Sequence, residues 1–242
     1  ELINSFPDFK GSFGDKRIEK RAVQVLKKLT IGRKSSLREV SQSEAEQKSF
    51  YRLFNNESFS ESGIEKSIVR RCSELCSEKH VLCIQDTTEF NFSNQRGRIK
   101  PSSGLGRTSH SGVLGFMLHS SLVVDAGCGS ALGYSFIKTW ERKEDMADRH
   151  ERNYPGLPID QKESYKWIAA TNQSKSLLKQ AASMTIIADR EGDIYDLLAN
   201  IDEKKVNLLI RSNFDRRIAG GIKLTDYLSS LPVLDQYTLS IR

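Results

Sequence analysis

Long apolar runs are absent from this sequence, and none approaches the roughly 18 residues that a membrane-spanning helix requires. No positively charged segment followed by an apolar one opens the chain, so we expect no secretory signal peptide. Because the first residue is Glu1 rather than methionine, we also expect the native start to lie upstream. With 38% hydrophobic and 28% charged residues and few prolines, the composition favours a soluble, cytoplasmic globular protein. Its 242 residues suffice for one large domain, or for one domain plus a small one.

Cysteine is scarce and forms no metal-binding pattern. The four cysteines include no CxxC pair, and no two histidines stand at ligand spacing. Cys72 and Cys76 are one helical turn apart, and Cys83 lies in an expected strand, so we interpret them as buried, reduced thiols. The phosphate-binding pattern G-x-x-x-x-G-K followed by Ser or Thr is missing as well, which argues against hydrolysis of nucleoside triphosphates.

Acidic residues are outnumbered by basic ones. The net charge of +6 and the pI near 9.1 favour a polyanionic partner. The basic residues gather in three groups. Each group taken alone could simply be a charged face exposed to solvent. Together, the three groups predict a channel that binds nucleic acid. They are Lys16, Arg17, Lys20, Arg21, Lys27, Lys28, Arg33, Lys34 and Arg38; then Arg96, Arg98, Lys100 and Arg107; and finally Arg211, Arg216, Arg217 and Lys223.

Two apolar runs of strand length each end on an aspartate: 81–85 leads to Asp86, and 184–188 leads to Asp189. Continuous apolar runs are typical of strands buried on both faces in a helix-covered sheet. Ligands bind outside the carboxyl ends of such strands, so we expect both carboxylates to converge there and to bind Mg²⁺ or Mn²⁺. The alternative is that either aspartate caps a helix or forms a turn. Asp193 is the better N-cap for an expected helix over 194–199, which leaves Asp189 without a capping role.

The first eighty residues have helical periodicity. Asp15 can cap a first helix, and Ser36 and Ser43 each precede a glutamate by three residues, as in a capping box. We expect the helix opened by Ser43 to end at 55–56, with the aromatic residues of 50–54 in a core rather than in a base-stacking platform. Two apolar stripes are expected at helical spacing. They are Ile18, Ala22, Val25, Leu26 and Leu29 in one helix, and Ile64, Ile68, Cys72, Leu75 and Cys76 in another.

From Val81 onward, strand patterns alternate with helical ones. We expect an antiparallel meander of three strands turning at 125–127, followed by a β-α-β unit, with an exposed excursion over 140–164. This order is that of an α/β, RNase H-like fold of the retroviral integrase type, with a mixed five-stranded sheet and flanking helices behind a small all-α domain. The expected elements are strands 81–85, 114–124 and 131–140, helix 164–182, strand 184–188, helix 194–199 and strand 206–210.

Five short segments, in order along almost the whole chain, resemble the DDE transposases of the insertion-sequence-four family, which includes the transposase of transposon five. They are Phe13-Gly14-Asp15-Lys16-Arg17, Tyr51-Arg52-Leu53-Phe54-Asn55, Ile84-Gln85-Asp86-Thr87-Thr88, Glu163-Ser164-Tyr165-Lys166-Trp167 and Ala188-Asp189-Arg190-Glu191-Gly192-Asp193-Ile194. Leu208-Leu209-Ile210 running into Arg211-Ser212 is similar to the family's fifth strand end.

The resemblance implies a helical domain over 1–78 that binds transposon ends, a catalytic domain over 79–214, and the start of a β-rich insertion over 215–242. It implies Asp86 and Asp189 as the first two of three catalytic acids. The third, a glutamate beyond the insertion, is not matched by Glu191 or Glu203, so we expect this chain to be an amino-terminal portion. DNA contacts are expected from Lys16, Arg17, Lys20, Arg33, Lys34, Arg52, Thr87, Arg107, Arg190 and Arg211.

The activity implied is cut-and-paste DNA transposition: cleavage of a phosphodiester and strand transfer by in-line displacement with two Mg²⁺ or Mn²⁺ ions. Partners would be double-stranded DNA, as terminal inverted repeats and target, and a second copy in a synaptic complex on the bacterial nucleoid. Two alternatives stay open. One is a catalytically incomplete DNA-binding regulator of transposition, and the other is a nuclease with two acids and no preference for repeat ends.

Overall fold

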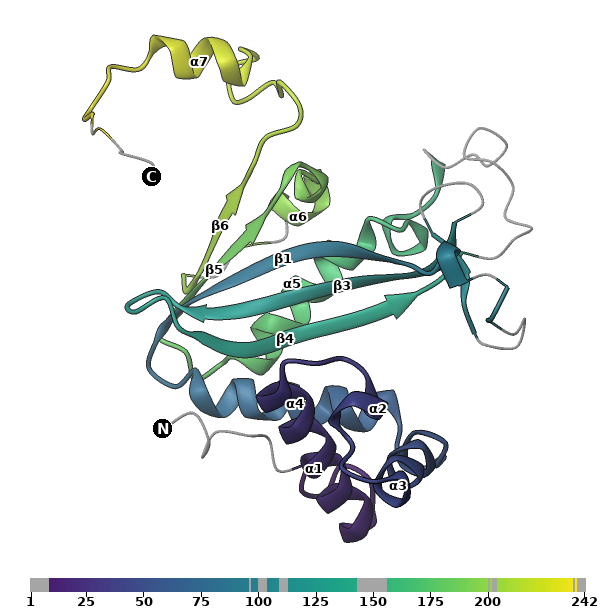
Figure 1. The fold of residues 1–242 in the computed structure, drawn as a ribbon. Helices are drawn as coiled ribbons and strands as arrows, with labels where there is room; N and C mark the ends of the chain where they lie inside the picture. The colour runs from purple at the N-terminus through teal and green to yellow at the C-terminus, as the bar shows by residue number, and fades with distance from the viewer. Residues whose placement is uncertain are drawn as a thin grey trace.

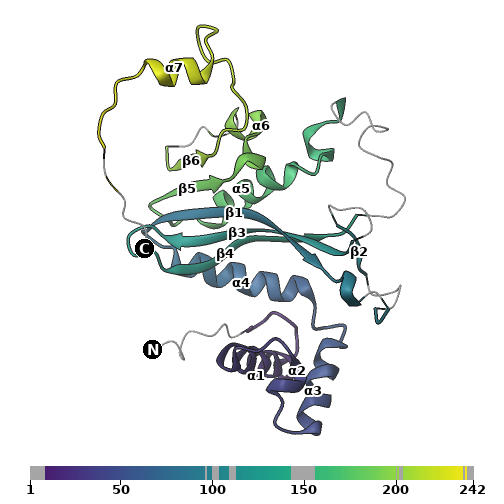
Figure 2. The same ribbon diagram turned by 45° about the horizontal axis from the view of Figure 1, so that its top comes forward.

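The structure is a computed structural model and describes residues 9–95, 97–99, 104–108, 113–142, 156–199, 201, 204–236 and 238. Four helices come first, and a mixed sheet with helices between its later strands follows (Figure 1). Figure 2 shows the first three helices as a group that meets the sheet through the fourth. The expected order, an α-helical segment before an α/β segment, is therefore present.

The first three helices are α1 (Lys16–Gly32), α2 (Leu37–Val40) and α3 (Glu44–Phe54). Asp15 caps α1 by accepting the main-chain N–H of Arg17, and Ser43 caps α3 by accepting that of Glu46. Ser36 precedes α2 but makes no side-chain cap, so the capping box expected there is wrong. The apolar faces meet in one cluster, as the helical spacing predicts. Its buried members are Phe9, Phe13, Ala22, Val25, Phe50 and Leu53.

Helix α4 (Glu61–Leu75) packs against the sheet rather than among the first helices alone. Cys72 and Cys76 join the apolar cluster beneath the strands, where Val81 and Cys83 are also buried. Leu75 is 41% exposed, so the apolar stripe of this helix is narrower than the sequence predicts. The thiols of Cys72, Cys76 and Cys83 are buried, in agreement with the interpretation of the cysteines as core residues, whereas Cys128 is exposed and is not a core residue. All four cysteines are free.

The sheet has five main strands and one short one. The order is β4, β3, β1, β5, β6, with the two-residue β2 also pairing with β3; β3 is antiparallel to β1 and β4, and β5 is parallel to β1 and β6. The expected meander and β-α-β unit are therefore both observed. The strands are β1 (His80–Asn91), β2 (Gly106–Arg107), β3 (Leu114–Asp125), β4 (Ala131–Trp140), β5 (Ser183–Ala188) and β6 (Val206–Ile210).

Helices cover one face of this sheet. Helix α5 (Tyr165–Leu177) and the short α6 (Tyr195–Ala199) pack on the same side as α4. The cluster that includes α4 contains Ile186 of β5, the cluster that includes α5 and α6 contains Ala188, and these alternate residues point to the same face. Helix α5 ends five residues earlier than expected. The opposite face is turned toward the viewer in Figure 1, and no labelled helix crosses it there. Its strand side chains, such as Leu82, Ile84 and Leu122, are only half-buried.

Strand β1 is much longer than the sequence predicts. It pairs with β3 as far as Asn91, but with β5 only as far as Ile84. Asp86 consequently lies just beyond the part of β1 that pairs with β5, but within the part that pairs with β3. The prediction that β1 ends before Asp86 is wrong. The cause is tertiary, since an antiparallel neighbour keeps the segment after Asp86 hydrogen-bonded and extended.

After β6 the chain leaves the sheet and forms α7 (Leu224–Ser230), seen apart from the other elements in Figures 1 and 2. Over the described residues 211–236, the β structure is a single bridge between Arg217 and Lys223. Most of the run 237–241, together with 143–155, Arg96, Lys100 and Glu203, lies outside the described residues. The proposed domain boundaries near 78 and 214 stay predictions.

Candidate catalytic site and nucleic-acid interface

The two aspartates singled out by the sequence are brought to the same level of the sheet. Ile84 of β1 pairs with Ile187 of β5, and Asp86 and Asp189 each follow that pair by two residues. Asp189 has extended backbone angles, so the strand direction continues to it. Because register partners in parallel strands point to the same face, both carboxylates belong to the open face, and both side chains are exposed.

One residue on each flank extends this row across four strands. Ser120 of β3 is the register partner of Asp86. On the other side, Ala188 pairs with Ile210, and the main-chain N–H of Arg211 donates to the Ala188 carbonyl at 3.2 Å. Arg211 therefore follows β6 at the level where Asp189 follows β5. An acidic pair bordered by a cation on one side can hold a divalent ion and a phosphate together.

Asp189 also has a local structural role. One of its carboxylate oxygens accepts the main-chain N–H of Glu191 at 2.9 Å, which caps the 3₁₀ turn η6 (Arg190–Gly192). Asp86 likewise accepts the N–H of Thr87 at 2.8 Å through one oxygen. The expectation that Asp189 has no capping role is wrong, because the turn begins immediately after the strand. Each of these hydrogen bonds involves a single oxygen, so a bound cation could still use the second.

Asp193 does not cap the helix that follows it, contrary to the sequence prediction. Its carboxylate accepts the main-chain N–H groups of Asn213 and Phe214 and both Nε and Nη2 of Arg216, at 2.7–3.1 Å. Burial by itself would raise the pKa of Asp193, but these hydrogen bonds outweigh it and leave the pKa below its ordinary value. Asp193 thereby ties the turn after Asp189 to the segment after Arg211.

A column of buried side chains lies on the helix-covered face beneath this row. The ring Nδ1 of His119, on β3, lies 2.9 Å from Oγ1 of Thr87, and the ring stacks edge-on against Trp167 of α5, with centroids 4.6 Å apart. His119 is fully buried and Trp167 nearly so. Burial, and then the charges of Lys166 and Lys138, lower the pKa of His119 to about 3, so the ring is neutral. The Thr87 hydroxyl therefore faces away from the face that carries Asp86.

Helix α5 also supports the turn after Asp189. Lys166 is buried along its stem, lies over the rings of Trp140 and Trp167, and forms an ion pair with Glu191 at 3.2 Å. A Cβ added to Gly192 would lie 2.5 Å from the Cβ of Ala188 and 3.4 Å from the Trp167 ring. The close approach explains why glycine occupies this position, since no larger residue fits between the strand and the helix.

The donor chemistry of the acidic pair fits Mg²⁺ or Mn²⁺. Both ions prefer carboxylate oxygens, and Mg²⁺ commonly keeps several waters while one or two carboxylates hold it. Within the described ranges, no group of three or more His, Cys, Asp or Glu side chains is placed to hold a metal. With a bound cation, the pair would supply two protein ligands.

The cations predicted to bind DNA on the first helices are exposed. Lys16, Arg17 and Lys20 are on the first turns of α1, while Arg33 and Lys34 follow its end and Arg52 is on α3. Arg17 remains almost fully exposed although it lies 3.6 Å from Asp15. Clustered exposed cations of this kind can neutralise phosphates along a duplex, with a strong dependence on salt.

Two features of these helices differ from the sequence predictions. Lys28 is not part of the exposed basic surface, because its Nζ donates to Glu46 at 2.8 Å and joins α1 to α3. The aromatic run on α3 is divided: Phe50 is fully buried, but Tyr51 and Phe54 are 47% and 49% exposed. Tyr51 stands next to Arg52, so α3 presents both an aromatic ring and a cation to solvent.

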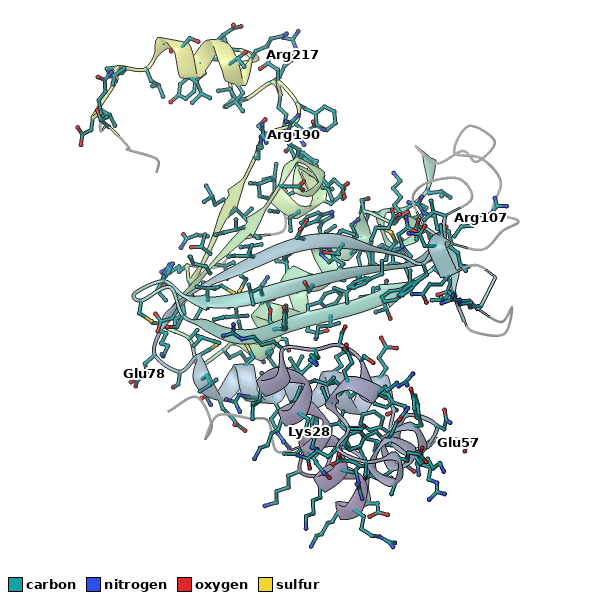
Figure 3. The ribbon with its side chains drawn as sticks, viewed as in Figure 1. Lys28, Glu57, Glu78, Arg107, Arg190 and Arg217 are labelled. Atoms are coloured by element: carbon teal, nitrogen blue, oxygen red, sulfur yellow. The ribbon has the colours of Figure 1, made fainter. Side chains whose placement is uncertain are left out.

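The remaining predicted DNA contacts do not form one patch. Figure 3 shows Arg190 near the ends of β5 and β6 and Arg107 beyond the far end of β1, with Lys28 among the first helices. Arg107 is on β2 and its main chain pairs with that of Arg142. Both Arg107 and Arg190 are exposed, as is Arg211. The structure therefore brings Asp86, Asp189 and Arg211 together with Arg190 close by, and leaves Arg107 and the cations of the first helices at separate sites.

His119, Asp193 and Lys166 were not identified as functional residues in the sequence. A usable signal exists for His119, because it occupies a position that the two-residue period of β3 predicts to be buried. Met117, Ser121 and Val123 share that face. A histidine among them must find a specific partner or remain unpaired. No comparable signal marks Asp193, whose partners come from a segment twenty residues later.

A family model described as transposase DNA-binding matches residues 10–59. The matched segment contains α1, α2 and α3 and most of the exposed cations described above. The match supports a transposase whose first helices bind DNA, as the resemblance implies. No helix in the described part of the chain combines the length and apolarity needed to cross a membrane.

Proposed function

We propose that this chain is a DDE transposase of the insertion-sequence-four type. It binds transposon ends through α1–α3, and its catalytic residues for DNA cleavage are Asp86 and Asp189. The equal register of these two aspartates on β1 and β5 is the observation that carries the proposal. The match of residues 10–59 to a transposase DNA-binding family model also supports the proposal. The strand order, three antiparallel strands beside two parallel ones, supports an RNase H-like fold for the catalytic part.

Three residues of the row have a role in this proposal. Asp86 and Asp189 hold divalent cations, and the resemblance implies a third acid, a glutamate that neither Glu191 nor Glu203 matches. When bound, such ions stabilise the attacking and leaving oxygens of an in-line displacement at phosphorus. Arg211 binds a phosphate of the substrate backbone beside Asp189, and the exposed Arg107 and Arg190 also contact the DNA. A second copy of the chain is expected to join in the DNA-bound complex.

The metal site can be tested by Mn²⁺ titration followed by electron paramagnetic resonance. We expect weak but saturable binding to the 242-residue chain, lost in Asp86→Asn and in Asp189→Asn. Asp226→Asn is a matched control, because Asp226 is an exposed aspartate on α7, away from the sheet. Equal Mn²⁺ binding in all four proteins would overturn the site. Duplexes selected by this protein from a random library then serve as substrates for cleavage with Mg²⁺ or Mn²⁺.

The second candidate function is a DNA-binding regulator of transposition. The observation in its favour is that, among the described residues, no third potential ligand accompanies the two aspartates. A regulator would bind the selected duplexes with the same affinity and salt dependence as a transposase. Absence of cleavage with both metals, alongside specific binding, would favour the regulator, whereas end-specific cleavage would exclude it.

A further inference from the structure

We propose that Thr87 and His119 are positioning residues for the acidic pair, and that with Trp167 they fix the main chain of Asp86 relative to the turn that begins at Asp189. The inference rests on the proposed function, because it assigns this support to the site at which metal and substrate would bind. It concerns groups on the covered face of the sheet, and so it assigns Thr87 a contact with His119 in place of the DNA contact expected from the sequence.

The first link joins β1 to β3 next to Asp86. Thr87 follows Asp86 directly, and its hydroxyl lies 2.9 Å from Nδ1 of His119. Thr87 and His119 are also register partners across the two strands. A side-chain bond between cross-strand partners restrains twisting of the pair, and so restrains the direction in which the Asp86 side chain leaves the strand.

The second link joins β3 to the turn after Asp189. The His119 ring packs edge-on against Trp167, and it also contacts Phe136 of β4 at a centroid distance of 6.0 Å. Trp167 lies directly against Gly192 in the turn that Asp189 caps. On the covered face, His119 and Trp167 therefore contact Thr87, next to Asp86, and Gly192, in the turn that begins at Asp189.

A third contact fixes the column itself. Gln85, the residue before Asp86, donates from Nε2 to Oγ1 of Thr171 on α5, and that hydroxyl donates to the carbonyl of Trp167. Residues on both sides of Asp86 are thus held by α5, directly or through His119. Loosening these contacts would leave the fold intact while allowing the separation of the two carboxylates to vary.

The histidine is an unfavourable choice for packing alone. It is completely buried, and its Nε2 has no hydrogen-bond partner among the described residues. An unpaired buried nitrogen lowers the free energy of unfolding compared with an apolar residue of the same shape. A histidine used only to fill space would be improved by replacement, whereas a histidine used to hold Thr87 would not.

This contrast gives the test. The double variant Thr87→Val/His119→Leu removes both hydrogen-bonding partners together, so no group is left unpaired and the melting temperature should be equal to that of the wild type or higher. The dissociation constant for Mn²⁺ should nevertheless rise about tenfold or more, as happens when groups that orient the ligands of a metal site are removed. Thr87→Val alone should weaken Mn²⁺ binding similarly, and Thr87→Ser, which keeps the hydroxyl, should restore it.

The comparison with Asp86→Asn separates this inference from the proposed function. If Asp86→Asn abolishes Mn²⁺ binding but the double variant binds Mn²⁺ like the wild type, the positioning role is wrong and the metal site stands. If Asp86→Asn binds like the wild type, both are wrong. Should the double variant fail to fold, Thr87→Val against Thr87→Ser decides, because equal Mn²⁺ affinity in those two proteins would overturn the positioning role.

Discussion

Ile84 of β1 lies beside Ile187 of β5, and each stands two residues before an aspartate. This single register relationship brings together carboxylates from two distant segments of the chain. A shift of one residue in the pairing would move one aspartate to the opposite face of the sheet. The β1–β5 register is therefore the feature on which the candidate site most directly depends.

The exposed cations of α1 should govern DNA affinity. Replacing Lys16 and Lys20 by alanine should reduce the slope of log affinity against log salt by about 1.8, because each phosphate contact contributes about 0.9. The matched control is Lys204→Ala/Lys205→Ala, which removes the same charge from the turn before β6. Fluorescence anisotropy with a labelled duplex at several salt concentrations measures both slopes. Equal slopes in the two double variants would show that α1 does not contact DNA.

Stability should depend on pH through His119. The folded pKa is lowered to about 3, whereas an unfolded histidine titrates near 6.5, so between these values the unfolded chain binds more protons. The free energy of unfolding therefore falls as the pH falls below about 6.5, by about 2 kcal/mol from pH 7 to pH 5. Urea denaturation at both pH values should show this loss in the wild type and less of it in His119→Leu. Identical losses would mean that His119 is not buried and neutral.

The ion pair between the buried Asp193 and the half-buried Arg216 should contribute more to stability than an exposed pair nearby. Arg216→Ala leaves a buried carboxylate without its cation and should lower the free energy of unfolding by about 3 kcal/mol. Lys223→Ala removes the exposed partner of Asp215, 3.3 Å away, and should cost less than about 1 kcal/mol. Urea midpoints compare the two variants. A larger loss from Lys223→Ala would contradict this ranking.

Glycine at position 192 should be required by close packing rather than by backbone freedom. Gly192→Ala would place a methyl group 2.5 Å from the Cβ of Ala188 and should destabilise the protein by about 1–3 kcal/mol. Gly32→Ala, in the last turn of α1, meets Val40 at 3.5 Å and should be neutral or stabilising, since alanine favours the helix. Thermal unfolding of both variants measures this difference in stability. Equal changes in melting temperature would contradict the prediction.

Local patterns in the sequence were sufficient for most elements. Asp15 and Ser43 mark the starts of α1 and α3, because a side-chain oxygen placed before a helix satisfies its first N–H groups wherever the helix later packs. The apolar runs before Asp86 and Asp189 likewise predict adjacent buried strands, and the structure pairs them. Net basic charge on α1 was also visible, since charge needs no fold to be counted.

Other features required the tertiary structure, because their partners are distant in the sequence. The length of β1 depends on β3, which holds the chain extended beyond Asp86. Lys28 is withdrawn from the basic surface by Glu46, and Asp193 is directed to Arg216 instead of to its own helix. The sequence by itself determined which carboxylates follow the two apolar runs that pair as β1 and β5. Only folding decided which side chains support them, because hydrogen bonds and packing between distant segments exist only once those segments are brought together.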